Sequence, residues 1–251
     1  MGGATKTFIY AANNRNGFLC GRAIADAGYR PELLLLHPAE RRKYGDEIQS
    51  VFPDTSVVEW RQDVLPELQN VAADVLLSVN FGYVFPAEML SQFRYPVNLH
   101  TGYLPYNKGS HPNVWSIVDG TPARVTLHLM TTDVDDGEIL ARLEVPVSPL
   151  ETGKSLYAKL EEASVELIGT VFTELLTGEV LTSPMPEGGT FHFARELDEL
   201  CALSLDETVK VGDLLRRLRA LSFPPYRNAY FMEGGRRVYV DISLDEEEPS
   251  L

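Results

Sequence analysis

Residues 74–100 read DVLLSVNFGYVFPAEMLSQFRYPVNLH. Two runs within this stretch, DVLLSVN and PVNLH, are continuously apolar instead of alternating, which is typical of parallel strands that are covered on both faces. Similar apolar runs occur upstream at 6–12, 31–38 and 55–60, and helix-like stretches separate them. This βαβ rhythm predicts an α/β fold, with a Rossmann-like, mostly parallel sheet flanked by helices.

The chain downstream of this stretch adds two β-rich runs and one long helix. The runs RVTLHLM (124–130) and ILARLEVPV (139–147) are close enough to pair as an antiparallel hairpin, so we expect a mixed sheet. Residues 152–177 carry apolar side chains along one stripe and are followed by Gly178, which predicts a long helix with a packing role.

The remaining residues predict a small second unit. The segment TSPMPEGG (182–189) is typical of a linker, the apolar spacing over 211–221 predicts a helix, and a Gly234-Gly235 turn precedes the run RRVYVDISL. We therefore expect one large catalytic domain over 1–183 and a small C-terminal α+β subdomain over 184–251. A strand with a free edge is an aggregation hazard, so the last run also predicts a homodimer contact.

The composition indicates an acidic globular protein. The chain has 251 residues, 44% of them hydrophobic, which is enough to bury a sizeable core. Its 36 acidic and 22 basic residues give a net charge of -14, which opposes nucleic-acid binding, although a few local cations can still hold a small anion. Because the sequence has neither a bilayer-spanning apolar run nor a secretory signal, we expect a cytoplasmic protein with no membrane partner. Cys20 and Cys201 lie in helix-like apolar patterns that favour free thiols over a disulfide.

Several common cofactor and nucleophile motifs are absent from the sequence. No G-x-G-x-x-G follows the first apolar run, and no G-x-x-x-x-G-K-[ST] occurs, so the usual phosphate cradles of dehydrogenases and P-loop enzymes are missing. The sequence also lacks C-x-x-C, H-E-x-x-H and G-x-S-x-G. We therefore expect no metal site and no serine nucleophile.

The block from residue 97 to residue 139 carries the chemistry. It reads VNLHTGYLPYNKGSHPNVWSIVDGTPARVTLHLMTTDVDDGEI and begins at a strand end, where α/β sheets place ligands. Asn98 and His100 are two apart on one strand and therefore point into the same crevice. The Asn98 amide can donate to a developing oxyanion, and His100 can take a proton from an attacking amine. A carboxylate from the D-x-D-D-G loop can orient that imidazole, which suits acyl transfer without a covalent intermediate.

This block resembles the folate-dependent formyltransferases, a family that includes methionyl-tRNA, glycinamide ribonucleotide and nucleotide-sugar enzymes. Five family motifs occur in the family's order: N-x-H at 98–100, L-P-x-x-x-G at 104–109, P-x-x-W at 112–115, V-T-x-H at 125–128 and D-x-G at 135–137. The resemblance implies a catalytic trio of Asn98, His100 and Asp135. Asp133 and Asp136 are neighbours of the catalytic aspartate, with Asp133 also a candidate for cofactor binding.

The resemblance also implies a formyl donor, 10-formyltetrahydrofolate, bound along the loop at 80–86. The candidate cofactor contacts in this loop are Phe81, Gly82, Tyr83, Val84 and Phe85, and for its three aromatic residues simple packing is an equal alternative. Candidate acceptor contacts are Tyr103, Lys108, His111 and Tyr226. The family usually has an arginine in place of Lys108. His128 and Trp115 are better explained as packing residues.

The nucleotide-sugar branch of the family is the most similar. The run YLPYNKGSHPNVWSI (103–117) and the short FPPYRNAYF (223–231) with its hairpin resemble those enzymes, whereas the tRNA branch has a larger C-terminal domain. The implied acceptor is an amino-dideoxysugar linked to a nucleotide, either a dTDP-linked 3- or 4-amino sugar or GDP-perosamine, for surface polysaccharide such as lipopolysaccharide O-antigen. The alternatives are a 10-formyltetrahydrofolate hydrolase, a formyltransferase for another small amine, and a binding module without activity.

Overall fold

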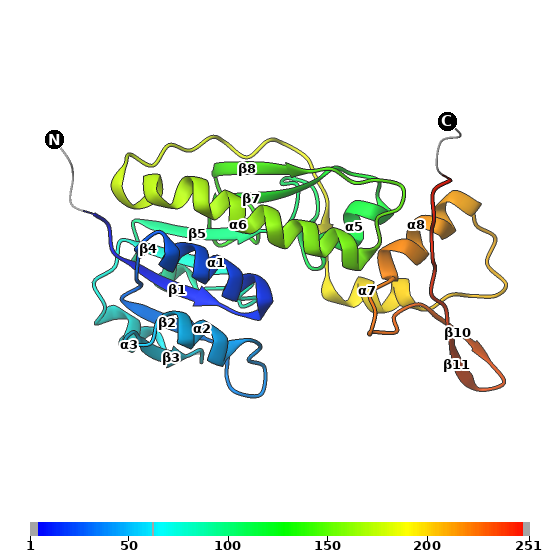
Figure 1. Ribbon diagram of the computed structural model, residues 1–251, viewed down its shortest axis with the longest axis horizontal. Coiled ribbons are helices and arrows are strands. Elements are labelled where there is room, and N and C mark those ends of the chain that lie inside the picture. Colours follow the sequence, from blue (N-terminus) through cyan, green and yellow to red (C-terminus); the bar gives the residue numbers. More distant parts are fainter. Residues whose placement is uncertain (1–4, 62, 248–251) are drawn as a thin grey trace.

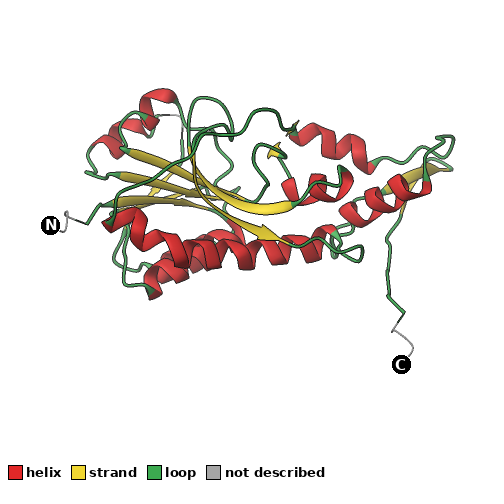
Figure 2. Ribbon diagram, turned by 90° about the horizontal axis from the view of Figure 1, so that it is seen from above, coloured by secondary structure: helices red, strands yellow, loops and turns green. Residues whose placement is uncertain are grey.

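The computed structural model describes residues 5–61 and 63–247, which build one seven-stranded sheet with helices on both faces (Figures 1 and 2). The five strands of the first half are parallel, and the last two are antiparallel. The predicted mixed, mostly parallel sheet is therefore confirmed. In spatial order the strands are β3 (Ser56–Glu59), β2 (Leu33–Leu36), β1 (Phe8–Ala12), β4 (Val75–Val79), β5 (Tyr95–His100), β7 (Ala123–Leu129) and β8 (Ile139–Val145).

The continuous apolar runs are explained by two separate cores, one on each face of the sheet. Successive side chains of a strand point to opposite faces, so β1 sends Phe8 and Tyr10 into one core and Ile9 and Ala11 into the other. Helices α1 (Asn14–Asp26), α2 (Gly45–Val51) and α6 (Gly153–Thr177) cover the first core, and α3 (Leu65–Gln69) and α4 (Ala87–Leu90) cover the second. Only the edge strand β3 is largely exposed among the parallel strands.

The long helix α6 begins where the sequence predicts, because Thr152 caps it. Thr152 Oγ1 accepts from the Ser155 N–H at 3.2 Å, and Ser155 Oγ accepts from the Thr152 N–H at 2.9 Å, which satisfies two donors at the helix start. The stripe that includes Leu156, Leu160 and Leu167 is buried against the sheet. Within the described part of the chain, no helix has the length and apolar character needed to cross a membrane.

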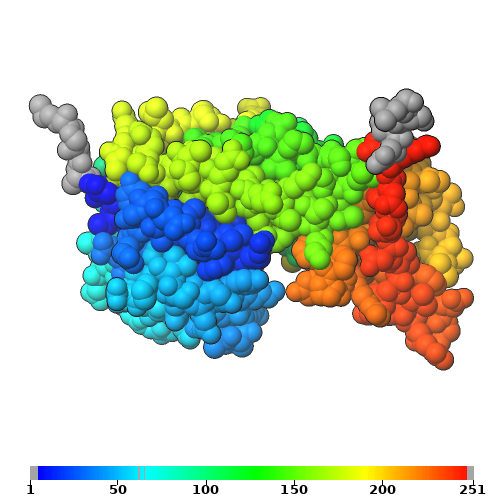
Figure 3. Space-filling model, viewed as in Figure 1, coloured from blue at the N-terminus to red at the C-terminus, as the bar shows by residue number. Residues whose placement is uncertain are grey.

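The chain from residue 191 onward lies at one end of the molecule, where its last part is coloured orange to red in Figure 3. It contains β9 (Phe191–His192), α7 (Ala194–Cys201), α8 (Val211–Leu221) and the hairpin β10 (Tyr230–Glu233) and β11 (Arg236–Tyr239). The sequence predicted α8 and the hairpin but not α7 or the parallel pairing of β9 with β6 (Lys108–Gly109). Cys20 is buried, Cys201 is half-buried, and both are free. The domain boundary at 183 and 184 stays a prediction.

Candidate active site

A cleft of about 1070 Å³ opens at the carboxyl ends of β1, β4 and β5. Ligands of open α/β sheets bind at this position, because the loops that follow parallel strands diverge there. Most of the residues predicted for the site line this cleft: Asn98, His100, Asp135, Asp133, Phe81, Gly82, Tyr83, Val84, Phe85, His111 and Tyr226. Tyr103 and Lys108 do not belong to its lining.

Asn98 and His100 lie on β5, which is held between β4 and β7. In the sheet register Asn98 is opposite Ser78 on one side and His128 on the other. The His100 side chain is only 7% exposed, so its imidazole is held by the core and not by solvent. Two side chains of one buried strand are positioned with little freedom, which suits chemistry that needs fixed geometry.

The surroundings of His100 determine which ring nitrogen can act as a base. Nε2 lies 2.9 Å from the Asn107 carbonyl oxygen, which only accepts, so Nε2 carries a proton. In the neutral imidazole Nδ1 is therefore free to accept, and it lies 3.4 Å from the Asp135 carboxylate. Gly102 leaves room for this ring, since a Cβ there would stand 2.4 Å from Nε2.

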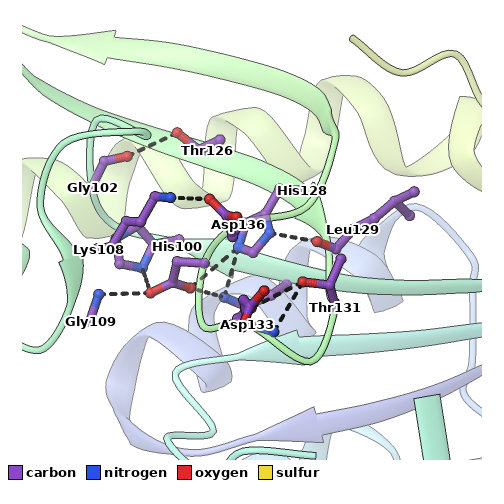
Figure 4. A network of polar contacts seen from close by, with 12 residues as sticks. His100, Gly102, Lys108, Gly109, Thr126, His128, Leu129, Thr131, Asp133 and Asp136 are labelled. Carbon is purple, nitrogen blue, oxygen red and sulfur yellow. Dashed lines mark hydrogen bonds and ion pairs between the residues drawn. The ribbon is translucent and has the colours of Figure 1, made fainter. Parts of the chain in front are cut away.

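Asp135 reaches the site in a strained backbone conformation. Its φ of 54° is in the left-handed region, which is uncommon for residues other than glycine, although aspartate and asparagine adopt it more often than most, and it is often found at functional sites. The Gly109 N–H donates to Asp135 Oδ2 at 2.9 Å, and Asp135 Oδ1 lies 3.4 Å from His128 Nε2. Figure 4 shows how this network joins the β5 side, where His100 lies, to the loop after β7.

The charges of the site favour a neutral base beside an ionised carboxylate. Burial lowers the pKa of His100, and the attraction of Asp135 only partly opposes this. Burial acts to raise the pKa of Asp135, but His100, His128 and the Gly109 N–H outweigh it and hold the pKa of this carboxyl well below its usual range. A neutral imidazole that gains a proton at Nδ1 would then form an ion pair with Asp135.

His128 fixes the orientation of the Asn98 amide. His128 Nδ1 donates to the Leu129 carbonyl at 2.8 Å, and the Asn98 amide nitrogen lies 3.2 Å from His128 Nε2. The same amide nitrogen lies 3.4 Å from Asp135 Oδ1, which is a weak contact. One amide N–H is thus held by His128, and the other can turn to an incoming carbonyl oxygen.

The loop after β4, residues 80–86, exposes mainly backbone groups to the cleft and keeps the rings of its phenylalanines in the core. Phe81 and Phe85 are 1% and 4% exposed and pack with Trp60 in the core, so they shape the wall from behind. Val84 is 65% exposed, and Gly82 has a φ of 73° with open space where a Cβ would stand. Within the described residues, the Gly82 and Val84 N–H groups donate to no acceptor. This loop therefore offers free backbone donors beside an apolar wall.

The four predicted acceptor contacts separate into two groups. His111 and Tyr226 line the cleft, and Tyr226 is 61% exposed. Tyr103 instead stacks on Tyr106 with ring centroids 5.7 Å apart. Lys108 forms an ion pair with Asp136. The structure thus places Tyr103 and Lys108 beside the site but outside the cleft.

The cleft also has lining residues that sequence reasoning missed. His192 stacks on Trp115 with ring centroids 3.9 Å apart and lies between the carboxylates of Asp119 and Glu196. The sequence did not predict His192 as a site residue, because it follows a linker-like segment and belongs to no recognisable motif. Arg15, Lys43 and Lys154 also line the cleft and come from three separate parts of the chain. Among the described residues, no group of three or more His, Cys, Asp or Glu side chains could hold a metal ion.

Two protein families match this chain. The family described as formyl transferase matches residues 25–172, and the family described as N-formyltransferase dimerization C-terminal domain matches residues 196–246. The dTDP-4-amino-4,6-dideoxyglucose formyltransferase of Mycobacterium tuberculosis is 34% identical over 178 residues, which are 70% of this chain and 76% of that protein.

Solved structures agree in fold. A 4-N formyltransferase from Francisella tularensis superposes with a TM-score of 0.83 at 24% identity over 98% of this chain and 100% of that one. An N-formyltransferase from Helicobacter canadensis in complex with folinic acid and dTDP-3-aminofucose gives 0.71 at 15% identity over 93% and 86%. Because the first family covers more than half of the chain, and the mycobacterial relative is matched over three quarters of its length, the chain belongs to the formyl transferase family.

Proposed function

We propose that this protein is an N-formyltransferase that moves a formyl group from 10-formyltetrahydrofolate to the amine of a nucleotide-linked amino-dideoxysugar. The observation that carries the proposal is the convergence of Asn98, His100 and Asp135 in one large cleft, with His100 Nδ1 and the Asn98 amide nitrogen each 3.4 Å from the Asp135 carboxylate. An oxyanion donor, a base and a carboxylate that steadies the base are what formyl transfer to an amine requires.

Each member of the trio has one task. As the amine nitrogen bonds to the formyl carbon, the Asn98 amide N–H that faces Asp135 Oδ1 at 3.4 Å turns to the oxygen that gains negative charge. His100 takes the proton that the amine must lose at Nδ1, and Asp135 stabilises the resulting imidazolium. When the bond from the formyl carbon to the folate nitrogen breaks, the same imidazolium is placed to return the proton to that nitrogen. The formyl group is transferred without any change in oxidation state.

The loop from Asn80 to Pro86 fits a folate donor. The free N–H groups of Gly82 and Val84 suit the polar edge of a pterin, and the wall backed by Phe81 and Phe85 suits its flat face. Tyr83 is half-buried and stacks on Trp60 with ring centroids 5.4 Å apart, so it borders the same wall. Asp133, which lines the cleft on the loop after β7, is the candidate acceptor for the donor's own N–H groups.

The proposed acceptor is a small nucleotide sugar and not a tRNA. The mycobacterial relative is named for a dTDP-linked 4-amino sugar, and this chain matches 76% of it. The net charge of -14 opposes a long polyanion, whereas His111 and Tyr226 are placed to contact a small acceptor. We further propose a homodimer, because the matched C-terminal family is described as a dimerization domain. We also propose that the protein is cytoplasmic and serves surface polysaccharide synthesis.

Mass spectrometry of a substrate panel tests the proposed activity. Purified protein and 10-formyltetrahydrofolate are incubated with dTDP-linked 3- and 4-amino sugars and with GDP-perosamine, and each product is weighed. We expect one panel member to gain a single formyl group, and Asn98→Ala to prevent the gain without changing the melting temperature. Because water could replace the amine, a reaction without sugar measures formate release. Formate release in every tube with no formylated sugar would establish the hydrolase instead, and formylation of only a different small amine would replace the acceptor class.

A further inference from the structure

Three cations line one wall of the cleft although the chain as a whole is strongly acidic. Arg15 lies in the first turn of α1, Lys43 lies in the loop after β2, and Lys154 lies in the first turn of α6. Neither lysine forms an ion pair with any residue in the described ranges, whereas Arg15 pairs with Glu161. With a net charge of -14, two unpaired lysines beside an arginine in one cleft indicate a local preference for an anion.

Hydrogen bonds of the Lys43 backbone tie the loop that carries this residue to the start of α1, where Arg15 lies. Asn13, which is 5% exposed, accepts the Lys43 N–H through its side-chain oxygen at 2.8 Å. The Asn14 N–H donates to the Lys43 carbonyl at 3.1 Å, so the loop that carries Lys43 is tied to the start of α1 at two points. Glu161, with a side chain only 4% exposed, holds Arg15, whose own side chain is 53% exposed. The Arg15 guanidinium is thus anchored on one side and open on the other.

One face of helix α6 extends the lining of the cleft beyond Arg15 and Lys43. Lys154, Tyr157, Ala158 and Glu161 all line the cleft and are spaced i, i+3, i+4 and i+7, which places them on one side of the helix. A rise of about 1.5 Å per residue separates Lys154 from Glu161 by about 10 Å. Burial, with the nearby Glu161 carboxylate, raises the pKa of Tyr157 to about 12, so its phenol stays a donor. The wall therefore offers several donors along the length of a diphosphate and its sugar.

The position of this wall in the fold also favours an anion. Strand order reverses between β1 and β4, and α/β proteins bind phosphorylated ligands in the crevice at such a reversal. Helix α1 starts there, and its first turn contains no acidic residue, so its N-terminal partial charge is uncompensated. Tyr44, Phe223 and Tyr226 line the same cleft and provide aromatic surface for a nucleobase.

From this arrangement we propose that Arg15, Lys43 and Lys154 form the subsite for the diphosphate of the nucleotide-linked acceptor. The proposal rests on the nucleotide-sugar acceptor argued above. It adds the residues that bind the diphosphate, which come from α1, the loop after β2 and α6 and not from the loop at 80–86. Arg15 and Lys43 bind one phosphate at the start of α1, and Lys154 binds the other near the mouth.

Calorimetric binding of nucleotides to the full-length protein, without folate or sugar, tests this subsite. The probes are dTDP and GDP, with thymidine and guanosine as matched probes that lack the diphosphate. Lys43→Met and Lys154→Met keep an apolar stem but remove the charge, and we expect each to weaken diphosphate binding about tenfold. Nucleoside binding should not change. Lys159→Met is the matched control, since Lys159 lies on α6 beside the cleft, pairs with Glu151 and is absent from the lining.

The outcomes separate this inference from the proposed activity. Equal diphosphate affinity in wild type, Lys43→Met and Lys154→Met would overturn the subsite, even if the enzyme formylates a sugar. Equal losses for diphosphates and nucleosides would also overturn it, because they would show a general distortion of the cleft. A selective loss of diphosphate affinity supports the subsite, even if no sugar on the panel is formylated and the proposed activity fails.

Discussion

The strands of the central sheet and the hairpin β10–β11 are both regular pairs, yet their surroundings differ completely. All five residues of β1 and all five of β4 are buried, with a core on each face. Every residue of β10 and β11 is half-buried or exposed, including Met232 at 53% and Tyr239 at 42%. An isolated two-stranded hairpin is marginally stable in water. The sheet therefore has a large buried core on both faces, whereas the hairpin buries little of its own surface.

This difference agrees with the proposed separation of catalysis, on β5, from association between copies, through the hairpin. Asn98 and His100 project from a strand that the core fixes on both sides, and transfer chemistry tolerates only small errors in position. The hairpin carries no member of the trio, and its exposed apolar side chains suit association with a second copy. Catalysis should thus be lost through small changes on β5, and assembly through small changes on the hairpin.

The largest expected effect is on folding. Phe172 is 2% exposed and its ring lies 5.1 Å from that of Phe8, so Phe172→Ala should destabilise the protein by about 3–5 kcal/mol. Val238→Ala, in the hairpin, should cost about 0.5 kcal/mol or less. Urea unfolding measures both. If both variants lowered the free energy of unfolding by the same amount at every protein concentration, the hairpin would be packed as tightly as the sheet, which contradicts the difference described above.

The next effect is on turnover alone. Asn98→Ala should lower kcat by about 10²–10³-fold, equivalent to about 2.7–4 kcal/mol, because one donor to the developing oxyanion is lost. Asn70→Ala is the control, since Asn70 is exposed and its side chain donates to the nearby Pro66 carbonyl, away from the cleft. Steady-state kinetics and thermal melting are measured for both variants. Near wild-type turnover for Asn98→Ala would remove this residue from the mechanism.

A smaller effect should appear in assembly. Met232→Lys places a charge on the exposed hairpin and should weaken the proposed dimer at least about tenfold, or about 1.4 kcal/mol. Light scattering across a dilution series measures this, and kcat per chain should stay close to that of the wild type. If the variant and the wild type dissociate at the same concentration, the hairpin is not the interface.

The smallest effect is a displacement of the pH profile. Only neutral His100 can accept the amine proton, so kcat/KM should rise with pH on the acid side, and the midpoint of this limb should lie below about pH 6.5, because burial lowers the pKa of His100 below that ordinary value. Asp135 attracts the imidazolium, so Asp135→Asn should lower the pKa of His100 further and move the acid limb to lower pH. If the acid limb of the Asp135→Asn variant moved to higher pH, Asp135 would not stabilise the His100 imidazolium, and the roles assigned to these two residues would be wrong.

Local patterns predicted most elements because their causes are local. The Thr152 cap, the stripe along α6 and the continuous runs of β1 and β4 each depend on neighbours in the sequence or on burial of both sheet faces. Helix α7 was missed because its apolar side chains form a short stripe with no fully buried residue. Phe81 and Phe85 were expected at the cofactor equally with the core, and only packing against Trp60 places them in the core.

The sequence by itself determined the α/β fold, the order of the family motifs and the identity of the candidate trio, because these depend on periodicity and on residue types in a fixed order. Only the tertiary structure decided that His100 Nδ1 faces Asp135, that His128 contacts the Asn98 amide, and that Arg15, Lys43 and Lys154 line one cleft. Each of these depends on residues that are distant in the chain. Their distances follow from the way strands and helices pack, which spacing along the sequence does not specify.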